Sequence, residues 1–151
     1  MSMDVPILLQ AMAERIATIP NVLGAWHEPP NTPPASKLPG VVMFWDGSMP
    51  TDIQASNMTG GTMWIAQIKA QILLPRKGDT PQEFVKSRAL ITPIVDAFAM
   101  PVRECLPALS GHVDRLAPVR AHGDLLIPYA GNLYMGAEVY FEAKFHRRRT
   151  T

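Results

Sequence analysis

A stretch in the middle of the chain alternates strictly between apolar and polar side chains, and it constrains the fold more than any other. The alternation runs from residue 63 to residue 74. Its apolar positions are Trp64, Ala66, Ile68, Ala70, Ile72 and Leu74, and the polar residues between them are Gln67, Lys69 and Gln71. A repeat of two places every second side chain on the same face of a strand. The stretch therefore predicts a strand with one face in the core and one toward water.

A helix is expected directly after this strand, at Thr80–Phe98. Thr80 fits the N-cap, Pro81 the first helical position and Glu83 the third, which is the spacing of a capping box. Pro93 is expected to kink this helix, because proline has no N–H and its ring collides with the preceding turn.

Hydrophobic periodicity also outlines the remaining elements. A helix capped by Asp4 is expected to run to about Thr18, with apolar residues three and four apart. The expected strands are Val41–Trp45, Val113–Arg120, Leu125–Tyr129 and Leu133–Phe145, and Val22–Trp26 is a candidate edge strand. In Leu133–Phe145 the odd positions are apolar and the even positions polar, apart from Gly136, so one face of this strand should meet the core. The order α–β–β–α–β–β predicts an α+β fold: a mostly antiparallel sheet of four to five strands with two helices packed on one face.

The chain is expected to form a single domain over residues 1–151, because 151 residues are enough for one core. Two segments should be irregular. Residues 27–40 hold five prolines and predict an extended arm or surface loop that could lie against a neighbour. Residues 46–62 predict a hairpin loop longer than the usual two to five residues, and such loops are often functional.

Charge and cysteine content exclude several classes. The 14 basic and 13 acidic residues give a net charge of +1, so no overall field attracts nucleic acid or a membrane. Cys105 is the only cysteine, which excludes an internal disulfide and fits a reducing compartment. Neither a signal peptide nor an apolar run of about 20 residues is present. We expect a soluble protein made in the cytoplasm, without a cofactor.

The candidates for catalysis are few. Two pairs recur ten residues apart and would suit a divalent metal if a hairpin joined them: His112 with Asp114, and His122 with Asp124. Glycines beside both pairs favour solvated turns instead. Cys105 has no nucleophile signature around it and is expected to be structural. The chain also lacks a Gly-x-Ser-x-Gly elbow and a phosphate-binding loop, so we expect no enzyme.

Side chains suited to protein contacts form a larger group. Methionine and tryptophan gather around the long hairpin, and methionine in a polar loop is typical of an adaptable interface. The residues expected at a protein interface are Trp45, Met49, Met58, Pro33, Pro34, Tyr140, Arg147 and Arg148. The terminal arginines suit an acidic neighbour or phosphates. A solvated tail is favoured, since the chain has no matching basic patch.

The order of these features resembles one protein family. A helix ends near Pro20, a long hairpin lies between Trp45 and Trp64, and a capped helix starts at Thr80. A final alternating strand, LYMGAEVYFEAKF, precedes a basic end. The chain is similar to the tail terminator (tail completion) proteins of long-tailed bacteriophages and to the related tail-to-head joining proteins. Its proline-rich stretch is longer than is typical of them.

The resemblance implies a structural virion protein of the tail or neck. Such proteins assemble as a homo-hexameric ring on the last ring of the tail tube protein, end tube polymerisation and present a surface to the head–tail connector. The implied partners exclude a membrane and any specific nucleic-acid site, the genome passing through the ring at most. The alternatives are another neck or tail component, such as a joining or tube-like protein, or a small metal-dependent enzyme using the two His/Asp pairs.

Overall fold

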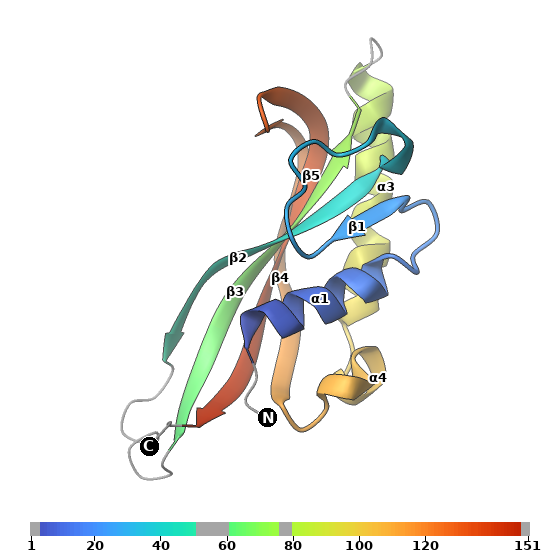
Figure 1. The fold of residues 1–151 in the computed structure, drawn as a ribbon. Helices are drawn as coiled ribbons and strands as arrows, with labels where there is room; N and C mark the ends of the chain where they lie inside the picture. Colours follow the sequence, from blue (N-terminus) through green and yellow to red (C-terminus); the bar gives the residue numbers. More distant parts are fainter. Residues whose placement is uncertain (1–3, 51–60, 76–79, 149–151) are drawn as a thin grey trace.

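The computed structural model describes residues 4–50, 61–75 and 80–148 (Figure 1). In chain order the elements are α1 (Val5–Ile16), β1 (Gly24–Trp26), η1 (Ala35–Lys37), β2 (Gly40–Pro50), β3 (Gly61–Leu74), α3 (Thr80–Phe98), α4 (Val102–Cys105), η2 (Pro107–Leu109), β4 (Val113–Tyr129) and β5 (Asn132–Arg148). The α+β class predicted from the sequence is confirmed. The short helix α4 was not expected.

One five-stranded sheet runs through the molecule in the order β1-β2-β3-β5-β4. Only β1 and β2 are parallel, and the other neighbours are antiparallel. The candidate edge strand is present as β1, which pairs with the first three residues of β2, Gly40 to Val42. The rest of β2 therefore forms that edge of the sheet.

The strands differ from the sequence prediction in two regions of the chain. The separate strands expected at Val113–Arg120 and Leu125–Tyr129 are one strand, β4, because three register shifts absorb the irregular residues while pairing with β5 continues. β2 extends to Pro50 and β3 begins at Gly61, so both ends of the expected loop at 46–62 belong to strands. Residues 51–60 lie outside the described part of the chain.

Both long helices pack on one face of the sheet and form the main core with it. The Asp4 carboxylate accepts a hydrogen bond from the Ile7 N–H at 3.0 Å, as expected for the cap of α1, although α1 ends at Ile16. α1 lies against β1 and β2, and α3 lies mainly against β4 and β5. In the centre, the rings of Phe98 and Phe141 meet edge to face with centroids 5.2 Å apart.

A second, smaller core lies on the opposite face of the sheet. Its buried members are Leu38, Val42, Leu73, Ile127 and Tyr134. The proline-rich segment, residues 27–39, covers it: Leu38 is buried there, and the Tyr129 hydroxyl donates to the Pro30 carbonyl oxygen at 2.6 Å. The segment expected to be an arm or loop therefore packs on its own sheet. Beyond this cover, β2 and β3 continue past α1 toward the lower left of Figure 1.

Candidate protein interface

Among the residues that the structure describes, only the proline-rich segment covers the sheet face opposite the helices. We call the remainder the open face. Its side chains come from four strands: Phe44 on β2, Gln67 and Lys69 on β3, Arg120 and His122 on β4, and Glu138, Tyr140 and Glu142 on β5. Gln71 on β3 lies on the same side of the sheet but is buried. Antiparallel register sets Gln67 opposite Glu142, Lys69 opposite Tyr140 and Gln71 opposite Glu138. These polar and aromatic groups therefore meet across the strands.

Glu138 is the centre of this arrangement. Its carboxylate accepts a hydrogen bond from the Gln71 amide at 2.9 Å and from the Tyr140 hydroxyl at 3.1 Å, and the Lys69 ammonium lies 3.4 Å away. Burial alone would raise the pKa of Glu138. The three donors outweigh burial and lower this pKa below its ordinary value. Glu138 therefore stays ionised and holds its neighbours in place.

Tyr140 is fixed on both sides. The Arg120 guanidinium carbon lies 4.3 Å from the centre of the Tyr140 ring, and the His122 ring meets it edge on at 5.8 Å. Burial, and then the hydrogen bond to Glu138, raise the pKa of Tyr140. The phenol therefore keeps its proton and acts as a donor. Tyr140 was one of the interface residues expected from the sequence.

Further contacts hold the rest of the open face. The Lys69 ammonium lies 5.2 Å from the centre of the Phe44 ring, and the Gln67 amide donates to Glu142 at 3.0 Å. These contacts are partly shielded from water, since 24% of the Lys69 side chain and 15% of the Glu138 side chain are exposed. Their effect is to keep tyrosine, arginine and phenylalanine in fixed positions, and tyrosine and arginine are the residue types that contribute most to protein interfaces. Such preorganisation reduces the entropy lost on binding.

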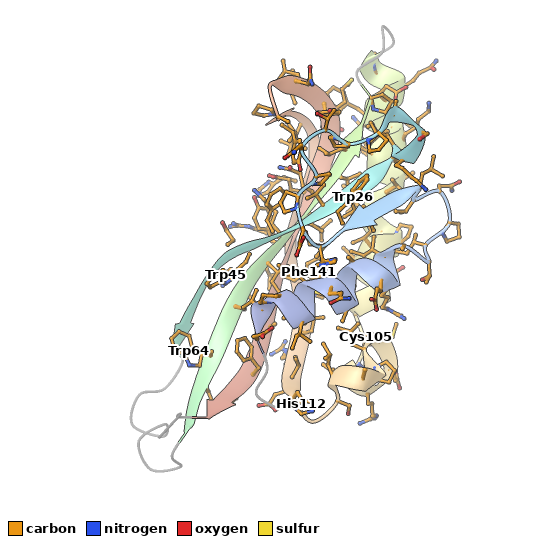
Figure 2. The ribbon with its side chains drawn as sticks, in the orientation of Figure 1. Trp26, Trp45, Trp64, Cys105, His112 and Phe141 are labelled. Carbon is orange, nitrogen blue, oxygen red and sulfur yellow. The ribbon has the colours of Figure 1, made fainter. Side chains whose placement is uncertain are left out.

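The other residues expected at an interface do not form one patch. Trp45 lies on β2 with 55% of its surface exposed, and it belongs to the helix-covered face, since it is paired with Ile68 (Figure 2). Pro33 is buried and Pro34 is exposed in the proline-rich segment. The backbone of Met49 pairs with Ile65, and that of Arg147 and Arg148 with Thr62 and Gly61. Met58 lies outside the described residues.

The sequence analysis missed most of the open face. Lys69, Arg120 and Glu138 were not proposed as site residues, and His122 was considered only as a metal ligand. The alternation had nevertheless placed Lys69 and Glu138 on the water-facing sides of their strands. That alternation is the signal that could have found them. The positions of Arg120 and His122 could not be read in this way, because two of the β4 register shifts lie on either side of them.

The two His/Asp pairs do not converge. His112 precedes β4 and His122 lies within it, so the pairs are roughly 30 Å apart along one strand. Asp124 forms a two-pronged ion pair with Arg88 on α3, with Nε to Oδ1 at 2.7 Å. Across residues 4–50, 61–75 and 80–148, no three histidine, cysteine, aspartate or glutamate side chains are placed to hold a metal. The hairpin that would have joined the pairs is replaced by a continuous strand.

Cys105 is buried at the end of α4, as Figure 2 shows on the helix side of the molecule. Burial raises the pKa of its thiol, and this effect outweighs the nearby charge of Arg15, which lowers it. A protonated, buried thiol is a poor nucleophile. This placement agrees with the structural role expected for Cys105.

Comparison with known proteins adds no assignment: no protein-family model matches the chain, and no curated protein sequence matches it significantly. Within the described part of the chain, the helices are too short or too polar to cross a membrane. The open face is therefore the feature from which a function can be argued.

Proposed function

We propose that this chain is a structural protein of a long-tailed phage that forms a ring on the end of the tail tube. The ring would contain six copies, end tube polymerisation and provide the junction to the head connector. The protein would be made in the host cytoplasm and reside in the tail or neck of the virion. Its partners would be other copies of itself, the tail tube protein and the connector protein. The proposal includes no enzymatic activity and no cofactor.

The open face is the observation that carries this proposal. It presents Tyr140, Arg120, Phe44 and Lys69 in fixed positions on a broad sheet surface that no helix covers. A surface that binds a flat, repeated partner such as the rim of a tube needs preorganised side chains rather than a deep pocket. The resemblance of the order of elements to tail terminators supplies the kind of partner.

The shape and charge of the subunit also support a ring. A ring requires two different surfaces on each subunit, one binding the other on the next copy. Here α3 and the projecting ends of β2 and β3 lie on opposite sides of the view in Figure 1. A net charge of +1 allows several copies to pack closely without strong self-repulsion.

Negative-stain electron microscopy of the purified protein, alone and mixed with purified tail tubes, tests the proposal. We expect rings and capped tube ends that no longer elongate. Arg120→Glu should weaken binding to tube ends, because it replaces the cation on the Tyr140 ring. Arg103→Glu on α4 is the matched control and should bind normally. Bare, growing tube ends at saturating protein would overturn the proposal. Binding to connectors but not to tubes would indicate another neck component.

A further inference from the structure

A pocket of about 520 Å³ lies on the helix side of the molecule. Its walls come from the connection between α1 and β1, from Pro39 and from α3. The apolar walls include Ile19, Leu23, Pro39, Leu90 and Pro93. The volume is within the range of sites that hold a ligand or a large side chain. Leu23 has 52% of its surface exposed, so the apolar surface continues outside the pocket.

Pro93 interrupts the hydrogen bonding of α3 at the pocket wall. It lies inside α3 and has no N–H, so the regular helical hydrogen bond to the Ala89 carbonyl is absent. Ala89 and Pro93 both line the pocket. The pocket is therefore an apolar hollow beside an irregular part of the helix.

A large apolar side chain that such a pocket could hold lies on another part of the same molecule. Trp45 has 55% of its surface exposed, and Figure 2 shows it partway along β2, across the molecule from α3. Tryptophan combines a large apolar surface with an indole N–H donor. Trp45 is the only aromatic side chain among the large apolar residues that are exposed in the described part of the chain.

The charges beside the two features are complementary. Among the described residues, Lys86 is the only charged residue that lines the pocket. Its side chain is 61% exposed, and its ammonium lies 3.3 Å from the Glu83 carboxylate. Asp46 follows Trp45 and is exposed on the part of β2 that forms the sheet edge. At a strand edge, neighbouring side chains on both faces are within reach of a partner that packs against the edge. A copy that accepts Trp45 could therefore pair Lys86 with Asp46.

We propose that Trp45 of one copy inserts into the pocket formed by Leu23, Ala89 and Pro93 of the next copy, with Asp46 meeting Lys86. This inference rests on the proposed ring, and it identifies the contact that links its subunits. Because the two surfaces lie on opposite sides of one subunit, the contact joins copies head to tail and closes only after a fixed rotation. A tryptophan in an apolar pocket is typical of the few residues that dominate interface affinity.

Two variants test the two sides of this contact independently. Trp45→Ala removes the inserted side chain, and Ala89→Arg fills the pocket from an exposed helix position where arginine is well tolerated. Each should weaken self-association by roughly 30-fold or more, as expected for a residue that dominates an interface. The matched controls are Leu126→Ala, another exposed apolar residue, and Thr92→Arg on the same helix outside the pocket lining. Both controls should assemble normally.

Mixing the two variants gives the decisive result. Ala89→Arg retains Trp45 and Trp45→Ala retains the pocket, so a 1:1 mixture should form a heterodimer and nothing larger, measured by native mass spectrometry. Normal assembly of either variant, or no heterodimer from the mixture, would overturn the inference. If the wild-type chain stays monomeric at high concentration, this contact is wrong. Capping of tube ends would then still decide the proposed function separately.

Discussion

Gly136 on β5 packs directly against the backbone of Ile72 on β3. A Cβ added to Gly136 would overlap the Ile72 carbonyl oxygen and lie 2.9 Å from the carbonyl carbon. Backbone atoms in the centre of a sheet cannot move aside without breaking the ladder. This close approach therefore requires glycine, and it lies next to the second core.

We therefore expect Gly136→Ala to lower the free energy of unfolding by about 3 kcal/mol or more. Gly123→Ala in the neighbouring strand is the matched control, since its added Cβ would lie 3.7 Å from Ile91 Cδ1. That variant should change stability by less than about 0.5 kcal/mol. Urea unfolding followed by circular dichroism measures both. Equal stabilities of the two variants would contradict the packing of β3 against β5.

A second prediction concerns the aromatic pair at the centre of the main core. Phe98 is fully buried, with its ring edge to face on Phe141. Phe98→Ala leaves a cavity between α3 and the sheet, and should cost about 3–5 kcal/mol. Val85→Ala on the same helix should cost less than about 0.5 kcal/mol, because Val85 is 57% exposed. If both changes cost the same in urea unfolding, α3 does not pack on the sheet through Phe98.

The lowered pKa of Glu138 predicts part of the acid dependence of stability. A carboxylate whose pKa is lower in the folded state stabilises the fold at any pH above its pKa in the unfolded chain, which is near 4.5. This stabilisation is lost as the pH falls through the pKa of the folded state. The wild type should therefore lose more stability between pH 7 and pH 3 than Glu138→Gln. Lys69→Met, which removes one of the groups that lower the pKa, should shift this loss to higher pH. Parallel profiles of wild type and Glu138→Gln would contradict the prediction.

The burial of Cys105 predicts slow chemical modification. Its side chain is almost inaccessible and its pKa is raised, so few native molecules present a thiolate. We expect a disulfide reagent such as DTNB to react at least roughly 100-fold more slowly with the native protein than with the protein in concentrated urea. Absorbance of the released thiol follows the reaction, and Cys105→Ala gives the background. Fast labelling of the native protein would show that the Cys105 thiol is not buried in the main core.

Alternation of side chains predicted the faces of the central strands because burial acts on every second residue of a strand. The expected core positions from Trp64 to Leu74 all face the helices. The prediction was wrong at the start of β5. Tyr134 was expected on the polar face and is buried, whereas Leu133 was expected in the core and is 44% exposed. Tyr134 is buried because the proline-rich segment, distant in sequence, folds over it.

Strand continuity in β4 could not be predicted. Prolines and glycine interrupt the pattern between Val113 and Tyr129, and these residues normally end strands. The strand continues because β5 lies beside it and each irregularity becomes a bulge in the ladder. The same continuity separates His112 from His122, so the metal site suggested by their spacing does not form among the described residues.

The sequence by itself determined the two long helices, the apolar faces of β3 and of most of β5, and the α+β class, because periodicity and helix capping are local properties. Only the tertiary structure decided which side chains meet. The contact of Arg120 with Tyr140, the three donors on Glu138 and the pocket beside Pro93 depend on register and on the packing of distant segments. Cross-strand register places partners at positions that no spacing within one strand reveals.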